Sequence, residues 1–262
     1  MRSLATIRTE DRGSVRILVI DNPQKRNALD FASLSELELA CAAAARDRVR
    51  CLVLRGAGDQ AFSSGFDLGA MDEGQGGDRP DLAVERAMEA VEAVPCPTVA
   101  FVNGAAFGAG CELAATCDLR VASAGIALGM PPAKLGVVYA AAGLRRFISL
   151  MGAAHTREMF FTGRPVEAEA ALAMGLVSRV VPAERAEAEV LALAEEIAAN
   201  APLAVQGMKR ILRLLEASHE RGLTEAEREE IAQLRTAAFD SADLREGRVA
   251  FRERRPPRFR GE

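Results

Sequence analysis

The chain has 262 residues, enough for one large domain or for a domain with an appendage, and enough to bury a substantial core. Hydrophobic residues make up 49% and charged residues 27%, which is ordinary for a globular protein. The formal net charge of −4 gives no electrostatic case for binding nucleic acid or a membrane, although local basic groups can still bind a small anion.

The cysteine and histidine contents narrow the chemistry further. Five cysteines, an odd number without a CxxC pair, indicate reduced thiols in a cytoplasmic protein. Two histidines, His155 and His219, are too few for a His-rich metal site, so no metal is expected. The first residues, MRSLATIRTE, lack the apolar segment of a signal peptide, and no apolar run approaches the ~20 residues of a membrane span.

Apolar runs and helical patterns alternate through the first 200 residues. Short runs ending at glycine, proline or asparagine predict strands, and longer stretches with apolar residues every three or four positions predict helices. We expect, in chain order, a strand in 14–23, a helix in 28–48, a strand at 49–56, a strand, glycine turn and capped helix in 61–71, a helix at 81–94, a strand, glycine turn, helix and strand in 96–123, helices near 142–151, 154–159 and 167–174, a strand at 178–181 and a helix at 183–199.

Strands that alternate with helices favour an α/β fold with mostly parallel pairing. From about Ala201 the character changes, because the rest of the chain is helical in pattern, charged and free of clear strands. We therefore divide the chain into an α/β core over 1–200 and a helical C-terminal region over 201–262.

The segment NGAAFGAGCELAATCD, residues 103–118, carries the first chemical signal. Small residues at 104–110 let a ligand approach the backbone closely, and a helix is expected to start near Ala109. The first amides of a helix lack partners within the helix and lie at its positive end, so they can bind an anion or a developing oxyanion. Glu112 lies in this first turn, either as a catalytic group or merely as a complement to the helix dipole.

A second strand, glycine turn and helix start lies in AFSSGFDLGAM, residues 61–71. Here the helix is expected to be capped by Asp67. The amide of Phe66 is expected to be exposed where the chain turns. If this turn and the one before Ala109 face one point, their two amides form an oxyanion hole.

Four segments in order resemble the crotonase superfamily, also called the enoyl-CoA hydratase/isomerase family. They are NPQKRNAL (22–29), AFSSGFDL (61–68), VNGAAFGAGCELAATCDLRVAS (102–123) and TGRPVEAEAALAMGLVSRVV (162–181). The C-terminal stretches APLAVQGMKRIL (201–212) and EGRVAFRERRPPRF (246–259) match as well. The resemblance therefore covers essentially the whole chain.

The resemblance implies a spiral of ββα turns followed by a helical region used in trimerisation, as a homotrimer or a dimer of trimers. It implies acyl-CoA thioester substrates and a stabilised enolate, with coenzyme A as part of the substrate and no separate cofactor. It places the two oxyanion amides on Phe66 and Ala109, where the family often has glycine at the second position.

The resemblance also implies coenzyme A and substrate contacts. Arg26 and Ala28 lie on the loop that holds the nucleotide, and Arg254 meets the 3′-phosphate. Without the resemblance, Arg26 and Arg254 would be taken as solvated surface charge. The full set of expected binding residues is Arg26, Ala28, Ser64, Asp67, Leu68, Pro132 and Arg254.

One position departs from the family pattern. Family hydratases usually carry two catalytic glutamates, and the first aligns with Glu112, but the second position holds Pro132. The usual isomerases depend on that second carboxylate, so isomerisation is disfavoured. General acid–base help contributes roughly 10²–10⁴-fold per group, so hydration with Glu112 alone would be slower.

Tyr139, the only tyrosine, lies beyond Glu112 in the segment LGVVY. A similar Glu…Tyr spacing occurs in the methylmalonyl-CoA decarboxylase branch of the family, where the tyrosine orients the substrate carboxylate. That branch has histidine at the position of Phe66, so the match is partial. Tyr139 is either such a catalytic group or a core aromatic residue.

Three functions remain open from the sequence. The first is an acyl-CoA lyase, hydratase-like, in which the amides of Phe66 and Ala109 stabilise an enolate and Glu112 is the acid/base. The second is a methylmalonyl-type decarboxylase that uses Tyr139. The third is a non-catalytic acyl-CoA-binding paralogue.

Overall fold

The computed structural model describes residues 5–73, 79–218, 224–253 and 255–262. Its larger sheet has six strands in the order β1-β2-β3-β5-β7-β10 within these ranges. β1 and β2 are antiparallel and the other neighbours are parallel. The strands are β1 (Thr6–Arg12), β2 (Val15–Asp21), β3 (Cys51–Gly56), β5 (Thr98–Val102), β7 (Leu119–Ser123) and β10 (Arg179–Val181).

β1 is absent from the sequence prediction. Its residues TIRTEDR are mostly exposed, since it is the edge strand of the sheet. An exposed and charged edge strand lacks the buried alternation by which strands are found.

A second sheet has the order β4-β6-β8-β9 in the described chain. Its strands are only two or three residues long: β4 (Ala61–Ser63), β6 (Ala105–Phe107), β8 (Ala127–Gly129) and β9 (Val166–Glu167). The β4–β6 and β6–β8 pairs are parallel, and β8–β9 is antiparallel. Of these strands, the sequence predicted β4 alone.

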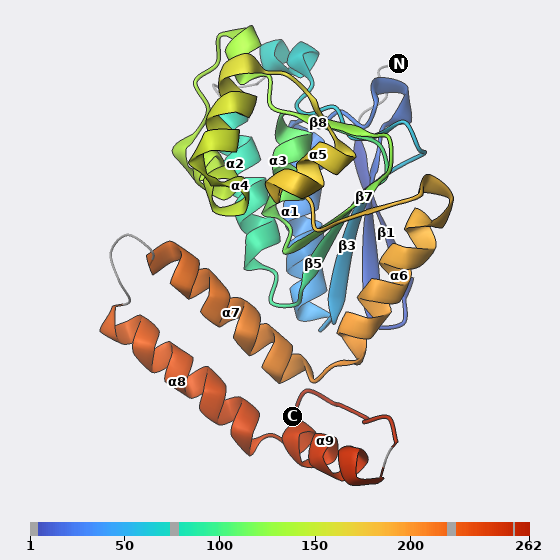
Figure 1. Ribbon diagram of the computed structural model, residues 1–262, viewed down its shortest axis with the longest axis vertical. Coiled ribbons are helices and arrows are strands. Elements are labelled where there is room, and N and C mark those ends of the chain that lie inside the picture. Colours follow the sequence, from blue (N-terminus) through green and yellow to red (C-terminus); the bar gives the residue numbers. More distant parts are fainter. Residues whose placement is uncertain (1–4, 74–78, 219–223, 254) are drawn as a thin grey trace.

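Helices cover both faces of the larger sheet (Figure 1). Side chains alternate along a strand, so Val15, Ile17 and Val19 of β2 pack toward α6 on one face. Leu18 and Ile20 of the same strand join the main core on the other face. The helices of this part are α1 (Phe31–Arg46), α2 (Pro80–Ala93), α3 (Ala109–Thr116), α4 (Ala141–Thr162), α5 (Ala168–Met174) and α6 (Ala183–Ala199), with the 3₁₀ turns η1 (Pro23–Lys25), η2 (Leu68–Glu73) and η3 (Pro132–Leu135).

The predicted pair of helices near 142–151 and 154–159 is the single element α4. A break at Gly152, where φ is +71°, interrupts its helical geometry and accounts for the two separate patterns. The predicted helix at 183–199 coincides with α6, and the helix predicted after Asp67 is the 3₁₀ turn η2. None of the described helices is long and apolar enough to cross a membrane.

The C-terminal arm consists of α7 (Pro202–Ser218), α8 (Glu225–Asp240) and α9 (Ala242–Glu253). Figure 1 shows α7 and α8 side by side and the whole arm below the sheets. Charged contacts join α7 to the core: Lys209 Nζ lies 2.7 Å from Asp118 Oδ2 and donates to the carbonyl of Cys96 at 2.9 Å. The α/β class and the helical C-terminal region are thus confirmed, while the role of residues 201–262 in oligomerisation stays a prediction.

Close backbone contact between β4 and α3 brings the two glycine turns together. A Cβ atom on Gly110 would lie 2.4 Å from the carbonyl oxygen of Ser63. We predict that Gly110→Ala lowers the free energy of unfolding in urea by about 1–3 kcal/mol, because the backbones must separate. In the control Gly69→Ala, the neighbour that the new methyl group meets among the described residues is a side-chain oxygen, Asp67 Oδ1, at 3.3 Å, and no backbone atom. Equal stability of the Gly110 variant and the parent would contradict this packing.

Candidate active site

A cavity of about 530 Å³ opens between the start of α3, the start of α4, η3 and α2. One wall carries the polar side chains of Glu112, Tyr139 and Arg146. The other walls are mostly apolar and include Phe66, Leu68, Val84, Leu135, Val137 and Ala142. A mostly apolar pocket with a few convergent polar groups is the usual form of a small-molecule site.

The two predicted oxyanion residues both line this cavity. Each follows a glycine with positive φ, +95° at Gly65 and +52° at Gly108. A Cβ atom on Gly65 would lie 3.2 Å from the amide nitrogen of Ala109, so the two turns are in direct contact. Gly65 is therefore needed for its backbone conformation and for this close approach.

The amides of Phe66 and Ala109 are available for a ligand within the described structure. Leu29 bonds to the residues on either side of Phe66, with Leu29 N donating to Gly65 O at 2.8 Å and Asp67 N donating to Leu29 O at 2.7 Å. Ala109 is the first residue of α3, where no intrahelical acceptor exists. The φ of Ala109 is not positive, since the described non-glycine residues with positive φ are Arg26, Asn27 and Arg48. The convergence of both N–H groups on one oxygen stays a prediction.

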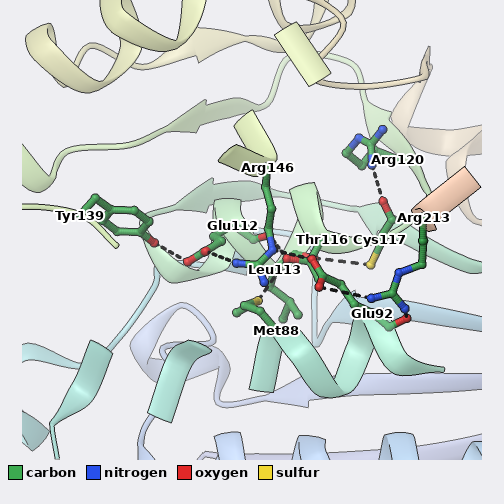
Figure 2. A network of polar contacts seen from close by, with 10 residues as sticks. All are labelled: Met88, Glu92, Glu112, Leu113, Thr116, Cys117, Arg120, Tyr139, Arg146 and Arg213. Carbon is green, nitrogen blue, oxygen red and sulfur yellow. Dashed lines mark hydrogen bonds and ion pairs between the residues drawn. The ribbon is translucent and has the colours of Figure 1, made fainter. Parts of the chain in front are cut away.

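Glu112 lies in the first turn of α3 and is only 3% exposed. Tyr139 Oη donates a hydrogen bond of 2.6 Å to Glu112 Oε2, and Arg146 Nη1 donates one of 2.9 Å to Oε1 (Figure 2). Both carboxylate oxygens are therefore bound by side chains from the beginning of α4 and the loop before it. The structure brings Glu112 and Tyr139, the two predicted catalytic residues, into direct contact.

Burial raises the pKa of Glu112, although the hydrogen bond from Tyr139 and the charge of Arg146 oppose the increase. Burial of its hydroxyl and the neighbouring Glu112 carboxylate raise the pKa of Tyr139 well above the usual value. Tyr139 thus remains a phenol at neutral pH and donates to Glu112. A carboxyl group with raised pKa exchanges its proton more easily near neutral pH.

Gly143 allows α4 to approach this pair. A Cβ atom at position 143 would lie 2.6 Å from Glu112 Oε1 and 2.6 Å from Tyr139 Cε1. Any larger residue would occupy space that the carboxylate and the phenol ring now fill.

The predicted binding residues have separate locations. Ser64, Leu68 and Pro132 line the cavity, whereas Ala28 is a buried residue of the 22–29 loop itself. The amide of Ser64 donates to the carbonyl of Arg26 at 3.0 Å, which joins that loop to the β4–η2 turn.

Asp67 has contacts within the protein. Its Oδ2 lies 2.6 Å from Lys25 Nζ, and its Oδ1 accepts from Gly69 N at 2.9 Å. Arg254 lies outside the described residues. All coenzyme A contacts, including that of Arg26, stay predictions.

Arg146, Glu92 and Gly143 were missed by the sequence analysis. Arg146 follows Arg145 in a predicted helix, and nothing local distinguishes the arginine that faces the site from its exposed neighbour.

In the described residues, no group of three or more His, Cys, Asp or Glu side chains could hold a metal ion.

Comparison with known proteins gives one family. The family model described as enoyl-CoA hydratase/isomerase matches residues 10–262. The chain is 32% identical over 251 residues to the methylmalonyl-CoA decarboxylase of Escherichia coli strain K12, covering 94% of this chain and 95% of that protein. It is 32% identical over 206 residues to the short-chain-enoyl-CoA hydratase of Clostridium acetobutylicum, covering 78% and 79%.

The fold agrees with that family. The crystal structure of an enoyl-CoA hydratase from Bacillus anthracis superimposes with a TM-score of 0.87 at 30% identity, covering 98% of this chain and all of that one. The crotonase-type α/β fold expected from the sequence is therefore confirmed.

The bond between Tyr139 and Glu112 can be tested without turnover. We predict that Tyr139→Phe raises the pKa of Glu112, since the variant loses a hydrogen bond that stabilises the carboxylate. Carbon-13 NMR of glutamate-labelled protein measures the titration, with Glu112→Gln identifying the resonance. An unchanged or lowered pKa would show that the phenol does not stabilise the charged form.

Proposed function

The chain belongs to the enoyl-CoA hydratase/isomerase family, and we propose that it is a lyase that processes acyl-CoA thioesters through an enolate. The observation that carries this proposal is the buried Glu112 carboxylate on the cavity wall, three residues after the amide of Ala109. The similarity to an enoyl-CoA hydratase over most of the chain supports hydration of a 2-enoyl thioester as the reaction.

In the proposed reaction the thioester oxygen accepts hydrogen bonds from the amides of Phe66 and Ala109. Charge accumulates on this oxygen as the enolate forms, and preorganised donors stabilise it more than they stabilise the substrate. The amide end of α3 adds a favourable dipole at the same position.

Glu112 is the proposed acid/base. Its carboxylate accepts a proton from water as the water oxygen adds to Cβ, and the resulting carboxyl group returns that proton to Cα of the enolate. The product is a 3-hydroxyacyl thioester, and the carboxylate is regenerated. Because Glu112 serves both steps, this reaction does not require a carboxylate at the position of the family's second glutamate, where this chain has Pro132.

Tyr139 orients Glu112 in this proposal. Its raised pKa makes it a poor proton donor to substrate, while its 2.6 Å hydrogen bond fixes one carboxylate oxygen. The other oxygen remains bound by Arg146.

A methylmalonyl-type decarboxylase is the second candidate. It is supported by the presence of Tyr139 on the cavity wall and by the similarity to the E. coli decarboxylase. However, Tyr139 would have to exchange Glu112 for the substrate carboxylate. The lining cations among the described residues, Arg79 and Arg146, already bind carboxylates. A neutral acyl group therefore fits this cavity better than an anionic one.

We further propose a cytoplasmic protein that associates as a trimer or a dimer of trimers. All five cysteines are free and buried, which supports a reducing compartment. The arm exposes large apolar side chains, with Met208 57% and Leu212 59% exposed on α7, which supports burial of this surface against another subunit.

Glu112→Gln tests the catalytic proposal. The amide keeps the shape of the side chain but cannot exchange a proton, so we expect crotonyl-CoA hydration to fall by roughly 10²-fold or more while thioester binding changes a few-fold. The control is Glu89→Gln, the same change on the exposed face of α2. If Glu112→Gln matches the parent on every thioester tried, the acid/base assignment is wrong and a binding function is favoured.

The substrate choice of the parent, together with Tyr139→Phe, distinguishes the two reactions. For a decarboxylase, turnover of methylmalonyl-CoA should be detectable in the parent and should fall about 10-fold or more in the variant, because the hydroxyl orients the substrate carboxylate. For the proposed hydratase, the parent should act on crotonyl-CoA and leave methylmalonyl-CoA intact. Release of CO₂ from methylmalonyl-CoA as the faster parent reaction would reverse the order of the two candidates.

Oligomeric state is the remaining test. We expect light scattering at micromolar concentration to give the mass of three or six chains of 27.9 kDa. A monomer at that concentration would contradict the role proposed for the arm.

A further inference from the structure

Arg146 separates two cavities. One is the candidate active site, and the other is a cavity of about 620 Å³ between α4, α7 and the end of α3. Among the described residues, Arg146 is the one that lines both. Its side chain is only 10% exposed. A buried guanidinium needs anionic or carbonyl partners, since desolvation of the charge is costly.

Two carboxylates supply these partners. Arg146 Nη1 lies 2.9 Å from Glu112 Oε1, and Arg146 Nε lies 2.6 Å from Glu92 Oε1. The two acids come from different helices, α3 and α2, and the arginine comes from α4. Because the guanidinium is planar with fixed donor directions, binding to Glu92 sets the direction in which Nη1 points at Glu112.

Glu92 is in turn bound by the C-terminal arm. Arg213 Nη2 lies 3.4 Å from Glu92 Oε2, and Arg213 Nη1 donates to the backbone carbonyl of Glu92. Figure 2 shows the resulting series of alternating charges, from Glu112 through Arg146 and Glu92 to Arg213. It joins the cavity to α7.

We infer that Arg146 is a positioning residue for Glu112, and that Arg213 on α7 contributes by holding Glu92 against Arg146. The inference rests on the proposed function, in which Glu112 is the acid/base. It assigns the arm an effect on the site that is separate from association.

The surroundings of Glu112 explain why its position depends on Arg146. Its ionised form is stabilised by Tyr139 from the loop before α4 and by Arg146 from α4. Glu85 of α2 faces it as a like charge, and Cys111 adjoins it on α3. Without Arg146, the described neighbours leave a buried carboxylate with one hydrogen bond and an unfavourable charge nearby. Protonation would then relieve the cost of burial.

The first experiment compares Arg146→Met, Arg146→Lys and the control Arg145→Met in the full chain. Arg145 is the exposed neighbour on the same helix, and Arg145→Met removes the same charge as Arg146→Met. For Arg146→Met we expect kcat for crotonyl-CoA to fall about 10-fold or more, and the acidic limb of the kcat/KM profile to move up by about one pH unit, since the base binds its proton more tightly.

Arg146→Lys should restore most of the pH position of the acidic limb, because the positive charge returns. It should restore only part of kcat, because lysine lacks the planar guanidinium with its fixed donor directions. Arg145→Met should match the parent in both. If Arg146→Met does not fold, as judged by its circular dichroism melt, Arg146→Lys is the variant that decides. A limb that stays at the parent pH in Arg146→Met, or unchanged kcat in a folded Arg146→Lys, would overturn the role of Arg146.

The second experiment compares Arg213→Met with Arg210→Met on the same helix. Arg210 pairs with Glu230 of α8 instead of the core. We expect Arg213→Met to lower kcat about two- to fivefold and Arg210→Met to leave it unchanged, with the mass of the oligomer equal in both. Equal kcat in the two variants would remove the arm from the inference.

Failure of the proposed function gives a different pattern. If Glu112→Gln retains full activity, the acid/base assignment fails whatever the arginine variants do. The carbon-13 titration of Glu112 still tests the inference in that case, since Arg146→Met should raise its pKa and Arg145→Met should not. An unchanged pKa of Glu112 in Arg146→Met would overturn the inference about Arg146 without bearing on the proposed function.

Discussion

The buried carboxylate of Glu112 is the constraint on which the arrangement of this site depends. An ionised carboxylate can be buried only if hydrogen bonds and opposite charge compensate for lost hydration. Tyr139 and Arg146 provide this compensation from 27 and 34 residues away in the sequence. The start of α4 must therefore pack against the first turn of α3, and Gly143 is the residue that leaves room for it.

The same packing determines what chemistry the cavity favours. Arg146 is shared between Glu112 and Glu92, and Arg79 is paired with Asp81, so each described cation of the cavity already has a carboxylate partner. A neutral acyl chain would meet mostly apolar walls, with the buried Glu112 carboxylate close to the two turn amides. This balance supports hydration as the proposed reaction, and the charged contacts of Glu112 continue through Arg146 and Glu92 to Arg213 on α7.

Much of the fold could be predicted from the sequence because burial leaves a periodic pattern. β2, β3, α2 and α6 lie close to their predicted positions, since each packs an apolar face or run against the core. β1 was missed because it is an exposed edge, and β8 and β9 because two or three residues carry no period. α4 was predicted as two helices because Gly152 breaks its geometry without ending it.

For the site, the sequence by itself determined the residues with special local geometry. Glycine turns followed by a helix start marked Phe66, Ala109 and Glu112, because a tight turn and unpaired first amides are local properties. Only the tertiary structure decided which side chains meet Glu112. Tyr139 gave no local sign of its partner, and Arg146 could not be told from Arg145, since the side of a helix that faces a cavity depends on how distant elements pack. Long-range contacts of this kind carry the electrostatics of the site, and no short stretch of sequence contains both partners.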